Sequence, residues 1–95
     1  MCIKQRFNFI LFIQNSGLKM SDFAARVFVS PSTLSQIVHC GQDGTFLFWS
    51  VVADQFNLNL KQLVKLYEPA YSCEEIIEDY EKVFKGYKYP ESVKL

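Results

Sequence analysis

The stretch Gly17–Ile37, GLKMSDFAARVFVSPSTLSQI, decides the fold. Gly17 suits the left-handed position that ends a helix, so a new element is expected after it. Ser30 and Pro31 give a second start signal, because serine caps a helix well and proline fits the first helical position. The stretch therefore predicts two short helices, one over about Met20 to Phe28 and one from Pro31 onward, with a short turn between them.

The second of these helices has one apolar and one polar face. Leu34, Ile37 and Val38 repeat at i, i+3 and i+4 and are expected to point inward. The side chains expected to point outward are Pro31, Ser32, Ser35, Gln36 and His39. A helix of this kind can enter a major groove and present its polar tips to base edges.

Apolar spacing predicts helices in the rest of the chain as well. They run over about Ile3 to Asn15, from a Thr45 cap to Phe56, over Leu60 to Tyr67, and from a Ser72–Glu75 capping box to Lys85. Gly86 is expected to close the last helix, and Tyr87 to Leu95 to form a short tail. We predict an all-α fold of five helices over residues 1–68, followed by a sixth, amphipathic helix and tail over 69–95.

Residues of about 3–64 resemble the helix-turn-helix domain of the Cro and phage-repressor type, the XRE family. The match consists of Ala24 in the second helix, Val29 and Ser30 after the turn, the string Ser32 to Ile37, a downstream helix with Trp49, Val52, Ala53 and Phe56, and a closing segment with Leu58, Leu60 and Leu63. The resemblance implies a five-helix domain in which the third helix reads DNA.

The partner that the resemblance implies is double-stranded DNA, and the function is that of a homodimeric, sequence-specific transcriptional regulator, most simply a repressor. The DNA-binding residues are expected to be Lys19, Ser21, Pro31, Ser32, Thr33, Ser35, Gln36 and His39. Gln36 suits bidentate contact with adenine N6 and N7, whereas Lys19 and Ser21 are expected at a phosphate. Control is expected from the protein's own concentration or from a regulatory protein partner.

Several residues depart from the family pattern. Phe28 stands where the turn commonly has glycine, and a positive φ there would strain a phenylalanine, so a different turn is expected. Met20 replaces the common glutamine, Cys40 takes the usual place of a glycine, and Ile13 and Val38 stand where many members pair Arg with Glu. The third helix contains no Lys or Arg, so phosphate neutralisation adds little to its affinity.

The charge of the 95-residue chain sums to zero, with ten basic and ten acidic side chains. Residues 1–65 carry six basic and three acidic side chains, and residues 66–95 carry four and seven, so only the first part suits an anion. Overall neutrality and an uncharged third helix favour a second hypothesis. In it, the chain is a protein-interaction module, such as an antirepressor or an antitoxin-like partner, that has lost DNA binding.

Other functional classes find little support. We expect no enzyme and no catalytic residue, because no Ser-His-Asp arrangement, phosphate loop or carboxylate pair in a cleft can be argued. Three separated cysteines and one histidine argue against a disulfide framework or a zinc site, so no metal or cofactor is expected. No stretch approaches 18 apolar residues, and free thiols fit a reducing compartment, so we expect a cytoplasmic protein without membrane contact.

Two apolar helix faces need a partner. One is the Phe9, Phe12 and Ile13 face of the first helix. The other is a stripe on the last helix, formed by Ile76, Ile77, Tyr80, Val83 and Phe84. Either the last helix folds back on the first, or both faces meet a second subunit. The two-fold symmetry of operator binding favours dimerisation through the last helix.

Overall fold

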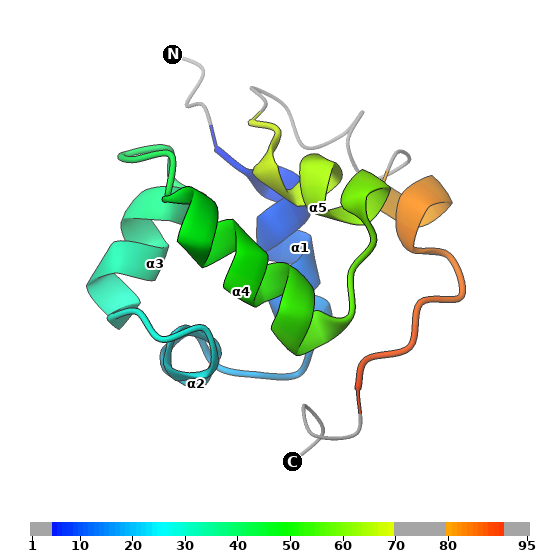
Figure 1. Cartoon of the computed structure of the whole chain (residues 1–95), viewed down its shortest axis with the longest axis horizontal. Coiled ribbons are helices and arrows are strands. Elements are labelled where there is room, and N and C mark those ends of the chain that lie inside the picture. The colour runs from blue at the N-terminus through cyan, green and yellow to red at the C-terminus, as the bar shows by residue number, and fades with distance from the viewer. Residues whose placement is uncertain (1–4, 70–79, 91–95) are drawn as a thin grey trace.

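The computed structural model describes residues 5–69 and 80–90, which form helices and connecting loops and contain no β-strand. The helices are α1 (Phe7–Asn15), α2 (Met20–Arg26), α3 (Pro31–Val38), α4 (Phe46–Phe56) and α5 (Leu60–Tyr67), as Figure 1 shows. A further helical turn covers residues 80–84. The all-α prediction is confirmed, while the predicted Ser72–Glu75 capping box lies outside the described residues. Within those two ranges, no helix is long and apolar enough to cross a membrane.

Side-chain caps fix where three of the helices begin. Ser30 and Thr45 each accept a hydrogen bond from the backbone N–H three residues further on, at 3.1 and 3.0 Å, as predicted for α3 and α4. At α5, Asn59 and Gln62 form a reciprocal capping box with distances of 2.9 and 3.0 Å, which the sequence pattern did not predict. These bonds satisfy backbone N–H groups that have no partner within the helix, and they fix the residue at which each helix begins.

The first helix begins later than predicted. The backbone N–H of Arg6 donates to the carbonyl oxygen of Val38 at 2.8 Å, so this part of the chain is held against the end of α3. Arg6 has a non-helical backbone as the N-cap residue, and α1 starts at Phe7. The predicted start at Ile3 lies outside the described residues, but Arg6 already interrupts the predicted helix.

A cluster of aromatic rings from α1, α2 and α4 forms part of the core. Phe9, Phe12, Phe23 and Phe56 are fully buried. The rings of Phe23 and Phe56 stack with centroids 4.8 Å apart, and Phe12 meets both of them edge-on. Since each buried ring removes about 150–250 Å² from water, these rings supply much of the hydrophobic stabilisation. The Phe9, Phe12 and Ile13 face of α1 is therefore buried within the chain's own core.

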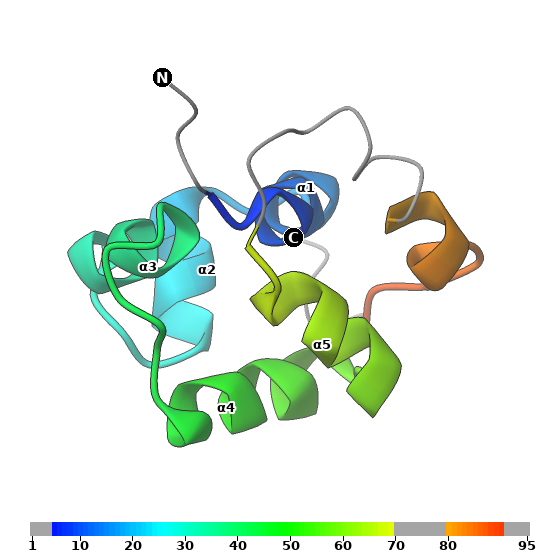
Figure 2. The same cartoon turned by 90° about the horizontal axis from the view of Figure 1, so that it is seen from above.

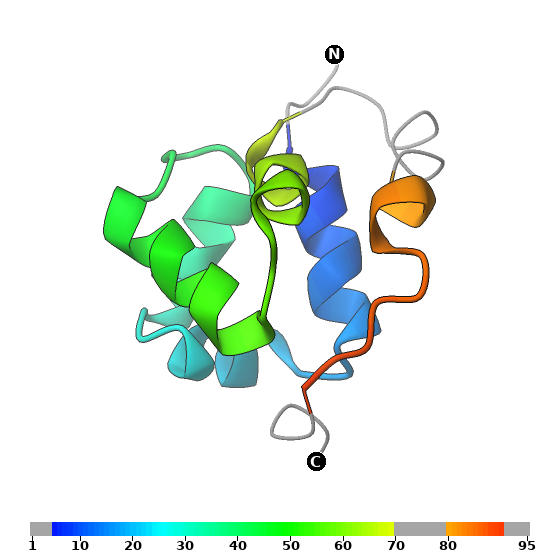
Figure 3. The same cartoon turned by 45° about the vertical axis from the view of Figure 1, so that its right-hand side comes forward.

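Residues 80–90 cover a side of α1 that the five helices leave open. Figure 3 shows this segment beside α1, and Figure 2 shows it on the opposite side of the molecule from α2 and α3. The rings of Phe84 and Tyr89 lie 5.5 and 5.1 Å from that of Phe12. The Tyr89 hydroxyl donates to the Phe12 carbonyl oxygen at 3.0 Å, and the Tyr87 hydroxyl donates to a carbonyl at the end of α4. As predicted, the chain is no longer helical after Gly86, and Tyr87 and Tyr89 of this tail pack on the core.

Part of the predicted dimerisation stripe is buried within its own chain. Tyr80 and Phe84 stack on each other at 4.5 Å and are both buried against the core, while Val83 is half-buried. Tyr80 and Phe84 are thus covered without a second subunit, in line with the alternative that the last helix folds back. Ile76 and Ile77 lie outside the described residues. The predicted boundary after residue 68 divides segments that share one core.

The turn between α2 and α3 has a left-handed residue at the position where glycine is common. α2 ends at Arg26, and Phe28 has φ +62° with its side chain 77% exposed. Cys40, after α3, has the same φ of +62°. The expectation that Phe28 would force a different backbone there is wrong, because both residues adopt the glycine-like conformation. Such a conformation costs a residue with a side chain about 1–2 kcal/mol.

Candidate nucleic-acid interface

The apolar face of α3 fixes this helix to the rest of the molecule. Leu34, Ile37 and Val38 are buried, as predicted, and α2 packs directly against α3. Ala24 of α2 is also buried, and its carbonyl oxygen accepts a hydrogen bond from the Val29 N–H at 3.0 Å. The small side chain and this bond fix the short turn, so α3 is presented as a rigid surface helix.

The outward face of α3 contains the polar side chains predicted for it. Pro31, Ser32, Gln36 and His39 are exposed, and Thr33 and Ser35 are half-buried. The Thr33 hydroxyl accepts a hydrogen bond from that of Ser30 at 2.9 Å, so it belongs partly to the helix cap. The remaining hydroxyl, amide and imidazole groups can donate and accept hydrogen bonds, which suits recognition of base edges.

Gln36 is oriented by a neighbour that the sequence pattern did not single out. The side-chain amide of Gln42 donates to the Oε1 of Gln36 at 2.7 Å. The backbone N–H of Gly41 also donates to the Gln36 carbonyl oxygen at 2.7 Å, which fastens the loop to the end of α3. The side-chain amide of Gln36 still has its two N–H donors, and its Oε1 atom has a second lone pair. The side chain can therefore still make two hydrogen bonds with one base.

Lys19 and Ser21 lie exposed at the start of α2, as expected for residues near a phosphate. Lys19 is the N-cap residue and makes no side-chain capping hydrogen bond. Within α2 itself the charges of Asp22 and Arg26 offset each other, however, and Lys19 precedes the helix as its N-cap residue. The electrostatic attraction of this face for DNA is therefore small and depends chiefly on the placement of Lys19.

Arg6 is not available to an outside anion, although it contributes to the basic excess of residues 1–65. Its side chain is 1% exposed. The guanidinium donates to the carbonyl oxygens of Ile37 at 2.5 Å, Gln42 at 3.1 Å and Tyr67 at 2.9 Å, and to the carboxylate of Asp43 at 3.2 Å. Arg6 thus ties the end of α3, the loop after it and the end of α5 to the start of α1.

Exposed apolar side chains lie at the α2–α3 turn and at the start of α4, although the apolar pattern of the sequence predicts that the Phe, Val and Leu positions are buried in the core. Besides Phe28, Phe46 is 90% and Leu47 is 72% exposed. Phe28 and Leu47 line a cavity of about 190 Å³ between the α2–α3 turn and the start of α4. The packing of α4 accounts for the difference, because Phe48 and Trp49 are buried in the core and the two residues before them point outward.

Comparison with protein-family models, curated proteins and solved structures found no match to this chain. Among residues 5–69 and 80–90, no three His, Cys, Asp or Glu side chains are grouped so that they could hold a metal ion. Function is therefore inferred from the geometry of α3 and its surroundings.

Proposed function

We propose that this chain is a sequence-specific DNA-binding protein of the phage-repressor helix-turn-helix type that acts as a homodimeric transcriptional repressor. The observation that carries the proposal is the exposed polar face of α3, which is backed by three buried apolar residues and by α2. A helix presented in this way fits the major groove, and the helix of a second copy reads another half-site about 34 Å away. An occupied operator then excludes polymerase.

Different residues contact the bases and the phosphates in the proposed complex. Gln36 is the strongest candidate base reader, because a Gln side chain matches the N6 and N7 edge of adenine. Ser32 and Ser35 can reach bases or phosphates, and Lys19 supplies the charge nearest to the start of α2. Nonspecific affinity for DNA comes mainly from neutralised phosphates, and each of them adds about 0.9 to the slope of log binding constant against log salt concentration. A protein with so few cations near the interface therefore has weak nonspecific affinity and a shallow slope. Specific binding then depends on hydrogen bonds and on two half-sites engaged together.

The test is selection of bound sequences from a random duplex pool at low salt, followed by affinity measurements on the enriched sequence. We expect an inverted repeat whose half-sites lie about one helical turn apart. Gln36→Glu should abolish binding, because it places a carboxylate against the DNA. Gln14→Glu is the matched control: it makes the same chemical change on an exposed residue of α1 and should leave the affinity unchanged.

The proposal fails if the wild-type protein binds no duplex at low salt, or if Gln36→Glu and Gln14→Glu behave alike. Equal affinity for every sequence, with no enrichment in the selection, would also contradict sequence-specific reading.

A second candidate function is that of a protein-interaction module, such as an antirepressor or an antitoxin-like partner. The observation that favours it is the exposed apolar pair Phe28 and Leu47 beside α3, because exposed apolar groups next to a polar face are typical of protein contacts rather than of DNA contacts. In that case the chain binds no DNA at any salt concentration. Replacing both residues with serine should then abolish binding of the partner while the fold is retained.

A further inference from the structure

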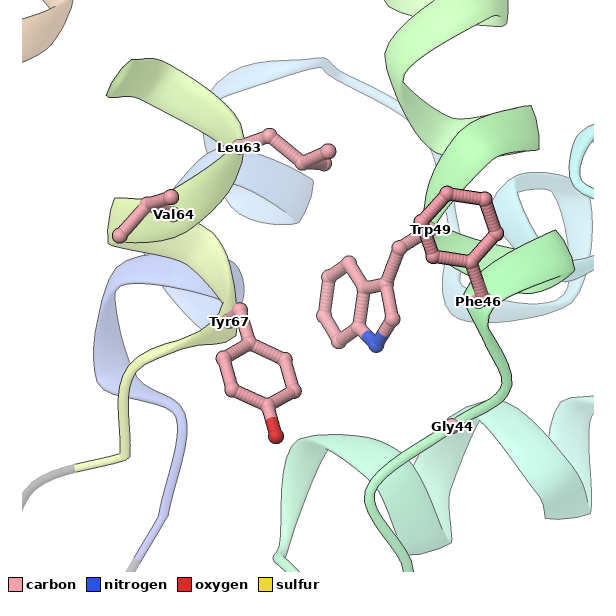
Figure 4. Close-up of a pocket in the computed structure, with 6 residues that line it drawn as sticks. All are labelled: Gly44, Phe46, Trp49, Leu63, Val64 and Tyr67. Atoms are coloured by element: carbon pink, nitrogen blue, oxygen red, sulfur yellow. The ribbon is translucent and has the colours of Figure 1, made fainter. Parts of the chain in front are cut away.

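We propose that a second copy of this chain docks on an apolar surface formed by the start of α4 and the outer side of α5, with Phe46 of each copy seated in the cavity of the other. This α4–α5 surface consists of Phe46, Leu60, Val64 and Tyr67. It adjoins a cavity of about 350 Å³ whose further lining residues are Gly44, Trp49 and Leu63, as Figure 4 shows.

Helix α5 has an apolar stripe that is exposed in the part of the chain that the structure describes. Leu60, Val64 and Tyr67 recur at i, i+4 and i+7 and are 77%, 43% and 43% exposed. The opposite side of α5 already packs on the core through the fully buried Leu66. A surface helix of a monomer needs only one apolar stripe, so the second stripe indicates a further contact.

The cavity between α4 and α5 has walls that are fixed by hydrogen bonds. The indole N–H of Trp49 donates to the carbonyl oxygen of Asp43 at 2.9 Å, and Arg6 holds the backbone of Tyr67. Gly44 is required beside the indole, because a Cβ at that position would lie 2.9 Å from the Trp49 Nε1 and the backbone there has φ +76°. Such preformed walls lower the cost of ordering on binding.

The geometry favours a second copy over an unrelated partner. An exposed ring, Phe46, and a recess lined by Trp49 and Tyr67 lie side by side on one surface. A two-fold axis near their boundary brings each ring to the recess of the other copy, which is the self-complementary contact that a symmetric dimer requires. Both halves of the contact are thus present on this chain.

The exposed apolar area of the surface also matches what a stable dimer needs. At about 150–200 Å² for a fully exposed large side chain, the exposed fractions of its four residues amount to roughly 400–500 Å². A standard interface buries about 800 Å² on each partner, of which roughly 60% is apolar. The two areas are of the same order, and exposed apolar patches of this size are often functional.

The inference rests on the apolar surface and holds whether or not the chain binds DNA. It also supplies the subunit contact that the proposed repressor needs, in place of Tyr80 and Phe84. The α4–α5 surface shares no residue with the outward face of α3.

The test is sedimentation of the full chain without DNA, from low to high micromolar concentration. Wild-type protein should pass from monomer to dimer. Phe46→Glu should raise the dimer dissociation constant at least about 30-fold, as expected for the central residue of an interface. A glutamate in the first turn suits the helix dipole, so the fold of this variant should be retained. Val64→Asp, on the other helix, should have the same effect.

Leu47→Glu is the matched control, because it introduces the same charge one residue further along, at a side chain that lines a different cavity. It should leave the dissociation constant unchanged. A wild-type protein that stays monomeric, or Phe46→Glu and Val64→Asp variants that still dimerise, would overturn the inference, as would dissociation by Leu47→Glu alone. A dimer that binds no DNA would refute the proposed function and leave this inference intact.

Discussion

Arg6 donates from Nε to the carbonyl oxygen of Tyr67 at 2.9 Å, and its guanidinium also lies over the ring of Tyr67, 5.2 Å from the centroid. The two residues are 61 positions apart and join the start of α1 to the end of α5. The same guanidinium lies 5.8 Å from the ring centroid of Trp49, so one buried cation faces two aromatic rings and several carbonyl oxygens. Its role is structural.

Arg6→Lys should destabilise the fold by about 2–4 kcal/mol, because an ammonium cannot reproduce the planar array of donors and leaves buried carbonyl oxygens unpaired. Asp43→Asn should cost less than about 1 kcal/mol, because the Asp43 side chain is largely exposed and solvent screens its ion pair with Arg6. Urea unfolding of both variants measures the difference. If Asp43→Asn is the more damaging change, the ion pair rather than the carbonyl contacts holds this junction.

Phe28→Gly should be more stable than Phe28→Ala by roughly 1 kcal/mol. Both variants lose the same exposed ring, but only glycine adopts φ +62° without a steric cost from Cβ. Thermal or urea unfolding of the two variants measures the free-energy cost of placing a Cβ on the left-handed backbone at position 28. Equal stabilities would show that the left-handed turn is not strained.

Gln36→Ala should reduce affinity for the preferred sequence by about 1–3 kcal/mol while affinity for random duplex DNA stays nearly unchanged. The reason is that a base reader contributes to discrimination, whereas phosphate contacts contribute to all sequences alike. Titration against the selected site and against single base-pair variants of it measures the effect. A uniform loss on every sequence would exclude Gln36 as a base reader.

Lys19→Ala should weaken binding to all sequences and reduce the magnitude of the salt slope by about one, because one phosphate contact is lost. Lys82→Ala, at an exposed residue of the helical turn 80–84, removes the same charge on the opposite side of the molecule from α2 and α3 and should leave the slope unchanged. Affinities at several salt concentrations give the slopes. Identical slopes for the wild type and both variants would remove Lys19 from the phosphate contacts.

The free energy of unfolding should fall as the pH rises from 10 to 12. Burial raises the pKa of Tyr87 from 10.0 to about 12, with a smaller contribution from Tyr80, and burial raises the pKa of Tyr89 as well. The unfolded chain releases these protons near pH 10 and the folded chain does so only at higher pH, so stability is full below pH 10 and is lost above it.

Urea midpoints at neutral pH and at steps between pH 10 and 12 give the alkaline slope. Tyr87→Phe should flatten it, because this change removes a phenol whose pKa burial raises. A wild-type midpoint that is constant to pH 12 would contradict the prediction.

Helices and the outward side chains of α3 could be predicted from local sequence, because caps and apolar spacing act within a few residues. Ser30, Pro31 and Thr45 start their helices as expected, and Leu34, Ile37 and Val38 face inward. This local information was sufficient to define the polar face of the candidate interface.

Contacts between distant segments could not be predicted in the same way. The partners of Arg6 are backbone carbonyl oxygens, which every residue has, so no sequence pattern marks them. The exposure of Phe46 depends on the phase of α4, which places one large apolar residue outward and its near neighbour Phe48 inward. The apolar stripe that includes Tyr80 and Phe84 has two possible partners, α1 of the same chain and a second subunit. Apolar spacing alone does not distinguish between them.

The cover that Tyr89 provides for Phe12 has a consequence for biosynthesis. Tyr89 is added 77 residues after Phe12, so the growing polypeptide cannot complete its core until nearly the whole of the described sequence has been translated. Until then the nascent chain presents an uncovered aromatic surface at the ribosome, where chaperones that recognise exposed apolar groups act. Premature termination before residue 80 would leave this surface permanently open and make the fragment a substrate for aggregation or proteolysis.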